Sequence, residues 1–222
     1  RLIDLLPINP GASVLDIATG TGMVLIPAAR RVGPGGHVTG IDISANMLEQ
    51  AKQAAETGGL NNVTLLKMDA EHLEFSDASF DAVTCGWAIF HLPPAAIHEI
   101  HRVCKPGGFF GVSLSERTAP EVGSAGAILS QLTKDYGIEV KWPTSEFSRP
   151  GGISAEEIEP LLVSNGFKHK QTLRETKERV YTSVEEFWKA LPPGTRTVLT
   201  AMDETTRSRF KENYLLKFKF IE

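Results

Sequence analysis

Short apolar runs alternate with amphipathic segments through the first half of the chain. Five short, mostly apolar runs have the length and composition of buried strands: residues 14–18, 37–43, 63–68, 80–85 and 109–114. Three segments between them are compatible with helices: residues 23–32, 44–57 and 94–104. Strands that alternate with helices at such short intervals predict an α/β fold, a Rossmann-like doubly wound, mostly parallel sheet with helices on both faces.

The second half of the chain predicts fewer regular elements. Ser154 and Ser183 each begin an S-x-x-E pattern, the capping box that marks the start of a helix. A strand is expected at residues 167–172, after the first of these helices has ended at a glycine. Phe210, Tyr214 and Phe218 fit a helix, while residues 216–220 fit a strand equally well, so both interpretations stay open.

We expect a single domain that spans residues 1–222. Residues 117–150 are rich in Gly, Pro, Ser and Thr around one helical stretch, which predicts a small inserted cap rather than another strand–helix unit. Residues 180–222 are expected to form a helical C-terminal extension of the same domain.

Composition narrows the class of protein. Hydrophobic residues make up 41% of the chain and charged residues 23%, as in soluble globular proteins. The formal net charge of -4 argues against a broad nucleic-acid-binding surface, so no nucleic-acid partner is expected. No apolar run approaches the roughly 20 residues that a transmembrane helix needs.

The two cysteines show neither the spacing of a metal site nor that of a disulfide framework. Cys85 and Cys104 both lie inside apolar stretches, which is typical of small buried side chains. We therefore predict that the protein holds no metal and that it is located in the cytoplasm, where thiols stay reduced.

Acidic residues and glycines gather at the points where the predicted strands end. Residues 16–22 (DIATGTG) include the end of the first strand, and Asp42 lies at the end of the second. Asp69 follows the third strand, and Cys85 and Gly86 end the fourth. The carboxyl ends of parallel strands form the ligand-binding edge of such sheets, so these residues are expected to be neighbours in space. The glycines allow a tight turn and a close approach by a ligand, which predicts a nucleotide-like ligand at this edge.

Two absences argue against a pyrophosphate ligand. The dinucleotide fingerprint G-x-G-x-x-G requires a third glycine, and Leu25 stands in that position. A P-loop requires Gly-Lys-Ser/Thr, and the chain has Gly22-Met23-Val24 instead. A nucleoside that carries another group fits better, with Asp42 accepting hydrogen bonds from ribose hydroxyls and Asp69 from the exocyclic amine of the base.

With these residues assembled, the chain resembles the class I S-adenosylmethionine-dependent methyltransferases. Within that family it is similar to the branch that includes ubiquinone/menaquinone-biosynthesis C-methyltransferases and many small-molecule methyltransferases. The matching stretches are VLDIATGTG (14–22), GIDISANMLEQAK (40–52), MDAEHLEF (68–75), FDAVTCGWAIFHL (80–92) and RVCKPGG (102–108). The resemblance covers residues 5–116 well, continues weakly through 154–172, and is poor in 117–150 and beyond 180.

The resemblance implies a binding residue at each part of S-adenosylmethionine. The residues placed around its methionine portion are Asp16, Ala18, Gly20, Thr21, Gly22, Cys85 and Gly86, with Ala18 standing where many relatives have glycine. The residues placed around its ribose and adenine are Asp42, Ile43, Met47, Asp69 and Ala70. Two alternatives stay open, because Asp16 could serve only to hold the loop and Met47 could belong to the core.

Methyl transfer from a sulfonium requires alignment more than it requires a strong catalytic group. A general base is needed only where the acceptor loses a proton, and His91, which follows the fourth strand, is the candidate for this role. The alternative for His91 is a structural side chain that bonds the turn before Pro93 and Pro94.

The expected function is therefore transfer of a methyl group from S-adenosylmethionine to a small organic acceptor, with S-adenosylhomocysteine as the second product. A non-catalytic S-adenosylmethionine-binding module is one alternative, and methylation of RNA or protein is another. Residues 85–88 (CGWA) carry no Asn-Pro-Pro-Tyr type of motif, which would have favoured a macromolecular acceptor.

Overall fold

The computed structural model describes most of the chain: residues 1–114, 131–132, 134–137, 154–175, 183–189, 199 and 202–218. The chain divides into two compact units, Arg1–Glu116 with Pro143–Gln171 and Arg117–Trp142 with Thr172–Glu222. Most of the cap predicted at residues 117–150 lies outside the described residues. The division into one domain, a cap and a C-terminal extension therefore stays a prediction.

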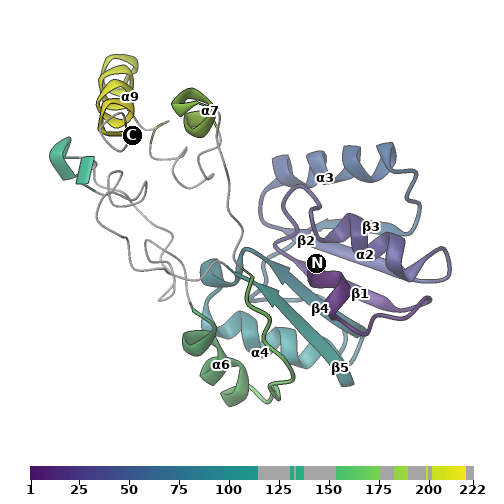
Figure 1. The fold of residues 1–222 in the computed structure, drawn as a ribbon. Coiled ribbons are helices and arrows are strands. Elements are labelled where there is room, and N and C mark those ends of the chain that lie inside the picture. The colour runs from purple at the N-terminus through teal and green to yellow at the C-terminus, as the bar shows by residue number, and fades with distance from the viewer. Residues whose placement is uncertain are drawn as a thin grey trace. The chain divides into compact units, whose positions relative to one another are not determined.

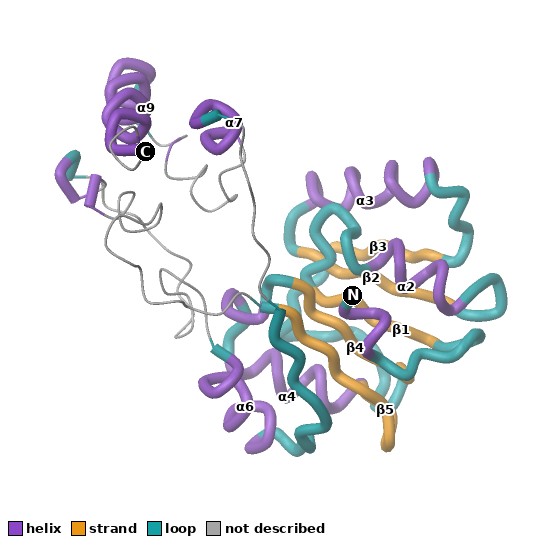
Figure 2. Tube along the Cα trace, viewed as in Figure 1, coloured by secondary structure: helices purple, strands orange, loops and turns teal. Residues whose placement is uncertain are grey.

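The first unit is built around a five-stranded parallel sheet (Figures 1 and 2). Its strands are β1 (Ser13–Ile17), β2 (His37–Asp42), β3 (Val63–Lys67), β4 (Phe80–Gly86) and β5 (Cys104–Ser113). They lie in the order β3-β2-β1-β4-β5, and every neighbouring pair is parallel. The order reverses between β1 and β4, and open α/β sheets bind their ligands at such a switch point. The predicted doubly wound sheet is confirmed.

Helices cover both faces of this sheet (Figure 1). One face carries α1 (Leu2–Leu5), α2 (Leu25–Val32) and α3 (Ala45–Thr57), and the other carries α4 (Pro94–Val103) and α6 (Ala155–Ser164). Successive strand residues alternate between the two cores: Val14 packs with α2 and α3, whereas Leu15 packs with α4. A strand buried on both faces needs apolar residues at consecutive positions, which is why the strands read as short apolar runs.

The predicted helix starts in this unit are confirmed. Ser44 caps α3, since its hydroxyl accepts a hydrogen bond from the Met47 N–H at 3.4 Å. Ser154 forms a complete capping box at the start of α6, with its Oγ 3.3 Å from the Glu157 N and its own N 2.9 Å from Glu157 Oε2. A single 3-10 turn, η1 (Ile89–His91), lies between β4 and α4 and was not predicted.

Two predictions near the edge of the sheet are wrong. Strand β5 begins at Cys104 rather than at the predicted residue 109, because Cys104 pairs with Phe80, and residues 105–108 form an irregularity inside the strand. Residues 167–172 form no strand. The Phe167 ring packs 5.3 Å from the Phe110 ring, and the residues after it are exposed and pair with no strand among the described residues.

The second unit contains α7 (Val184–Lys189) and α9 (Glu204–Phe218) in its described part. The helix start predicted at Ser183 is confirmed, because its Oγ accepts a hydrogen bond from the backbone N–H three residues on, at 3.1 Å. Helix α9 decides the open alternative at the C-terminus in favour of a helix. Phe210 is fully buried there, with its ring 5.4 Å from the Tyr136 ring. No helix within the described ranges is long and apolar enough to cross a membrane.

Candidate functional site at the carboxyl edge of the sheet

The glycine loop between β1 and α2, residues 18–24, has an unusual backbone. Ala18, Gly20 and Gly22 have φ angles of 51°, 56° and 87°, so three alternate residues adopt a left-handed conformation. The Thr19 N–H donates to the Ile41 carbonyl at 2.9 Å, and the Gly22 N–H donates to the Thr19 carbonyl at 2.9 Å. Alanine in this conformation costs roughly 1 kcal/mol, which gives a physical reason for glycine at position 18 in relatives.

Asp16 lies beneath this loop and connects four elements. Its side chain is 1% exposed. One carboxylate oxygen accepts a hydrogen bond from the Thr19 hydroxyl and the other from the Thr84 hydroxyl, both at 2.7 Å. The Leu25 N–H at the start of α2 also bonds this carboxylate. These contacts support the role of holding the loop, one of the two roles considered for Asp16.

Burial sets the protonation of Asp16. Desolvation raises the pKa of this carboxyl from 3.8 to about 6, although the hydrogen bonds from Thr19, Thr84 and Leu25 lower it. The nearby charge of Asp42 adds a smaller increase. The carboxyl is therefore ionised at neutral pH and takes up a proton in mild acid.

Asp42 joins the glycine loop to α3. Its Oδ2 accepts a hydrogen bond from the Gly20 N–H at 2.9 Å, and its Oδ1 accepts one from the Ser44 N–H at 2.9 Å. Each carboxylate oxygen has a second lone pair, so both can still accept a hydrogen bond from a ribose hydroxyl. The expected proximity of Asp42 to the glycine loop is confirmed.

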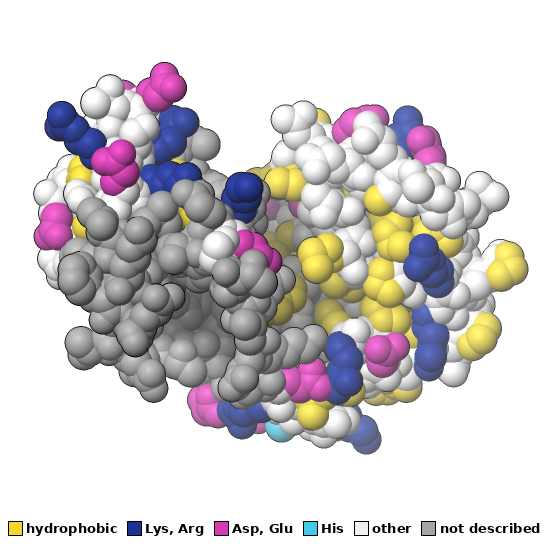
Figure 3. Space-filling model, turned by 45° about the horizontal axis from the view of Figure 1, so that its top comes forward, with side chains coloured by type: hydrophobic (Ala, Val, Ile, Leu, Met, Phe, Trp, Pro, Cys, Tyr) yellow, Lys and Arg dark blue, Asp and Glu magenta, His cyan; other side chains and the backbone are white. Residues whose placement is uncertain are grey.

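Apolar side chains are exposed next to Asp42. Ile43 is 71% exposed and Met47 is 39% exposed, so Met47 does not belong to the core. At the end of β3, Ala70 is buried and Asp69 is exposed, with its Oδ1 accepting the Glu71 N–H at 3.0 Å. Apolar side chains, drawn in yellow, are exposed on the face of this unit shown in Figure 3. The arrangement at the end of β2 suits a planar base flanked by apolar side chains.

The end of β4 packs against the glycine loop. A Cβ at Gly86 would lie 2.5 Å from Val24 Cγ2, so only glycine permits this approach. Cys85 is fully buried, and burial raises the pKa of its thiol. A ligand at this edge can therefore meet Cys85 only through its backbone.

His91 lies in the 3-10 turn that follows β4. Partial burial lowers the pKa of its imidazole, so the ring is neutral at neutral pH. The Phe90 ring lies 4.3 Å from it. The structure shows no hydrogen bond from the imidazole to any described residue, so the alternative in which His91 bonds the turn before Pro93 has no support.

Comparisons with known proteins show the family of this chain. The family described as a methyltransferase domain matches residues 14–108. A demethylmenaquinone methyltransferase from Staphylococcus epidermidis is 37% identical over 171 residues, 75% of this chain and 66% of that protein. The protein of that name from Staphylococcus aureus is 35% identical over 178 residues, 78% of this chain and 69% of that protein. The chain belongs to the class I S-adenosylmethionine-dependent methyltransferases.

The chain spans about two thirds of the length of these relatives. A solved structure, the YcgJ protein from Bacillus subtilis, has a TM-score of 0.62 and 23% identity, covering 94% of this chain and 85% of that one. This likeness supports the fold alone. The predicted enzyme class and S-adenosylmethionine as its methyl donor are confirmed at the level of the family.

The donor chemistry of the methyltransferase fits the residues at this edge. The carboxylate of Asp42 could accept hydrogen bonds from ribose hydroxyls, and the exposed Ile43 and Met47 could offer apolar surface for adenine. The roles of all the predicted donor contacts stay predictions.

Leu25, which stands in the third-glycine position of the dinucleotide fingerprint, has a counterpart on β2. A Cβ at Gly40 would lie 2.7 Å from Leu25 Cδ1 and 3.0 Å from Thr19 Oγ1. The glycine that allows a close contact between helix and strand is therefore on the strand rather than on the helix.

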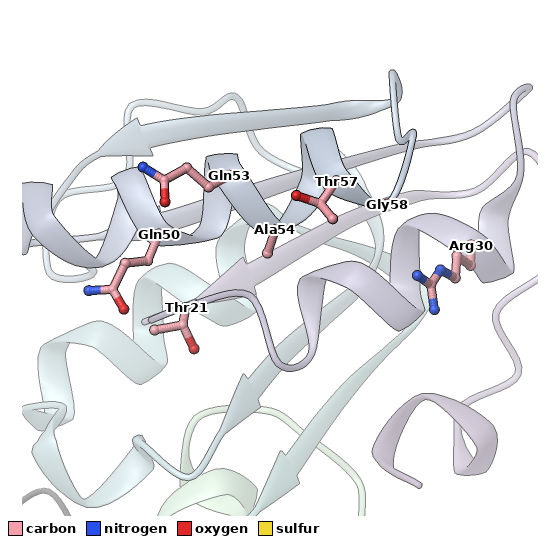
Figure 4. A pocket seen from close by; sticks show the side chains of 7 residues that line it. All are labelled: Thr21, Arg30, Gln50, Gln53, Ala54, Thr57 and Gly58. Atoms are coloured by element: carbon pink, nitrogen blue, oxygen red, sulfur yellow. The ribbon is translucent and has the colours of Figure 1, made fainter.

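A groove lies beside α3 (Figure 4). It has a volume of about 570 Å³ and is lined by Thr21, Arg30, Gln50, Gln53, Ala54, Thr57 and Gly58. Only Thr21 belongs to the predicted donor contacts. The other lining residues lie outside the predicted donor site.

Three residues of this edge were missed by sequence analysis. Thr19 and Thr84 hold Asp16, but the register that places Thr84 beside Asp16 belongs to the folded sheet. Trp87 follows β4 with its side chain 57% exposed. The signal in the sequence was a tryptophan soon after an apolar strand.

Proposed function

We propose that this protein transfers a methyl group from S-adenosylmethionine to a small acceptor with an oxygen-bearing aromatic ring, of the quinol class. The observation that carries the proposal is 37% identity, over 75% of the chain, to a protein named demethylmenaquinone methyltransferase. The exposed Trp87 and the neutral His91 at the end of β4 support an aromatic acceptor at the same edge.

Different residues of the chain are assigned to the methyl donor and to the acceptor. Asp42, Ile43 and the glycine loop hold the donor, which supplies a methyl group bound to a positively charged sulfur. Residues 87–91 lie beside the loop and face the acceptor. Close, aligned placement of the two reactants contributes much of the acceleration expected for such a displacement.

Methyl transfer to a ring carbon releases one proton, so the reaction needs one group that accepts it. A nucleophilic ring carbon forms a bond to the methyl carbon while the carbon–sulfur bond breaks and its electron pair stays on sulfur, giving S-adenosylhomocysteine. The ring carbon then loses its proton, and the neutral imidazole of His91 accepts it. This proton acceptance is the role that we propose for His91.

The test uses radiolabelled S-adenosylmethionine with naphthoquinol, catechol, RNA and casein as acceptors. We expect transfer to naphthoquinol and none to RNA or casein. His91→Gln is expected to lower the rate by about 100-fold while leaving the dissociation constant for S-adenosylmethionine within about twofold. His98→Gln, on the exposed side of α4, is the matched control and is expected to change neither value.

Two results would contradict the proposal. Donor binding without transfer to any acceptor favours the non-catalytic module, and transfer to RNA or casein favours a macromolecular substrate. The net charge of -4 supports the small acceptor, and the two free cysteines support the proposed cytoplasmic location.

A further inference from the structure

Trp87 has a backbone conformation that is unfavourable for its residue type. Its φ angle is 60°, in the left-handed region that favours glycine. Its N–H donates to the Ser113 carbonyl at 2.8 Å, which continues the β4–β5 pairing by one residue and holds the backbone in place. Strained residues of this kind cluster at functional sites, where the surrounding structure maintains them.

The strain serves no packing role for the side chain. The ring is 57% exposed although it belongs to the largest side chain type. Within the described part of the chain, no aromatic ring stacks on it and no group accepts a hydrogen bond from its indole N–H. Both the flat face of the ring and its one hydrogen-bond donor are therefore available.

The position of Trp87 places it beside the donor loop. Ile17 pairs with Cys85, so β1 and β4 leave the sheet at the same level, one into the glycine loop and the other into Trp87. The intervening Gly86 touches Val24 of that loop. On the other side of Trp87, the chain enters the turn that carries His91.

The geometry points to Trp87 as the residue that holds the acceptor ring, stacking on its face and donating the indole N–H to one of its oxygens. This inference rests on the proposed function and names the residue that recognises the acceptor class. A planar ring offers a face to the indole, and a hydroxyl oxygen offers an acceptor to the N–H. An aliphatic amine or thiol offers neither a planar ring nor an oxygen.

The test measures binding rather than turnover. Calorimetry follows naphthoquinol binding to the protein saturated with S-adenosylhomocysteine. Trp87→Ala and Trp87→Gly are expected to raise the dissociation constant for naphthoquinol about tenfold, and Trp87→Phe, which keeps a ring but no donor, about threefold. Binding of S-adenosylhomocysteine is expected to change less than twofold in all three variants.

Thermal unfolding of the same variants separates recognition from structure. Both Ala and Gly remove the ring, but only Gly relieves the left-handed strain, so Trp87→Gly is expected to melt within about 2 °C of Trp87→Ala. At an unstrained position the glycine variant melts lower than the alanine variant, so similar melting temperatures indicate the strain. Val163→Ala, which trims an exposed apolar residue of α6, is the control and is expected to leave naphthoquinol binding unchanged.

Each remaining outcome is decisive. Unchanged naphthoquinol binding in Trp87→Ala, or loss of S-adenosylhomocysteine binding in both truncated variants, overturns the role of Trp87. A wild-type protein that binds S-adenosylhomocysteine but not naphthoquinol also overturns it. A wild-type protein that binds no S-adenosylhomocysteine overturns the proposed function itself.

Discussion

The loops that follow β1 and β4 leave the same edge of the sheet and are built in opposite ways. After β1, internal hydrogen bonds hold the loop: Asp16 accepts from two threonine hydroxyls, and Asp42 accepts from the Gly20 N–H. After β4, Trp87 and His91 present side chains with no hydrogen bond to any described residue. One loop is preorganised by its own contacts, and the other keeps its chemical groups available.

This difference matches the two reactants. A donor that is the same in every member of a family is served by a loop whose shape is set before binding, because preorganisation reduces the entropy lost on binding. An acceptor that differs between relatives is bound by side chains that have no other structural role. Changes at the β1 side are therefore expected to affect stability and donor binding, and changes at the β4 side are expected to affect the acceptor.

The largest effect is expected from protonation of Asp16. Its pKa is raised in the folded protein from 3.8 to about 6, so folding favours the protonated form. The contribution of this proton to the free energy of unfolding is complete below pH ~4, falls as the pH rises to ~6 and is absent above that. The free energy of unfolding therefore decreases by about 3 kcal/mol over this range. Chemical denaturation of wild type and Asp16→Asn across this range measures the difference.

The difference in the free energy of unfolding between wild type and Asp16→Asn separates the contribution of Asp16 from those of other carboxylates. The pKa values of Asp81 and Glu99 are lowered by Lys105 and Arg102, so their contributions have the opposite sign and cancel in the comparison. A difference that stays constant from pH 4 to 7 would show that the loop does not depend on a buried ionisable group.

The next effect concerns donor binding. Asp42→Ala removes the acceptor of the Gly20 N–H and the proposed ribose contact, so affinity for S-adenosylmethionine is expected to fall about 30-fold, or ~2 kcal/mol. Calorimetry measures the dissociation constant. The control is Asp77→Ala, an exposed carboxylate paired with Arg102, which is expected to change donor affinity less than twofold. Equal losses in both variants would refute a specific role for Asp42.

A smaller effect is expected from the buried hydroxyl on β4. Thr84→Val keeps the shape of the side chain but leaves one Asp16 oxygen without its partner, at a cost of about 1.5 kcal/mol in the free energy of unfolding. Thr84→Ser restores the hydroxyl and is expected to recover most of that loss. Denaturant unfolding provides the measurement, and a serine variant as unstable as the valine variant would assign the effect to packing instead.

The smallest effect is expected at Ala18. Ala18→Gly relieves left-handed strain but increases the freedom of the unfolded chain, so the two terms nearly cancel, within about 0.5 kcal/mol. Ala54→Gly, on the exposed face of α3, has no strain to relieve and is expected to lose about 1 kcal/mol. Denaturant unfolding of the two variants compares them, and equal losses would show that Ala18 is unstrained.

Much of the fold could be predicted from local patterns. The helix that starts after Ser44 and the apolar run of β1 depend on neighbouring residues, and both are confirmed. The two wrong predictions concern segments whose secondary structure depends on a partner strand. Pairing with Phe80 extends β5 back to Cys104, and residues 167–172 have no described strand to pair with.

The candidate site also contains residues that the sequence could predict and contacts that it could not. Strand-end residues such as Asp42 could be found because parallel strands bring their carboxyl ends to one edge. The bond between Asp16 and Thr84 could not, since it joins residues 68 positions apart through a register that only the sheet defines. The left-handed backbone of Trp87 was equally invisible, because residue type argues against it.

The sequence by itself determined the order of strands and helices, the glycine loop and the family to which the chain belongs. These properties follow from short-range periodicity, turn chemistry and spacing along the chain. Only the tertiary structure decided that Asp16 is buried under two threonine hydroxyls, that Gly40 makes room for Leu25, and that Trp87 is held exposed. Each depends on contacts between distant segments, whose free energies are set by packing and burial rather than by local preference.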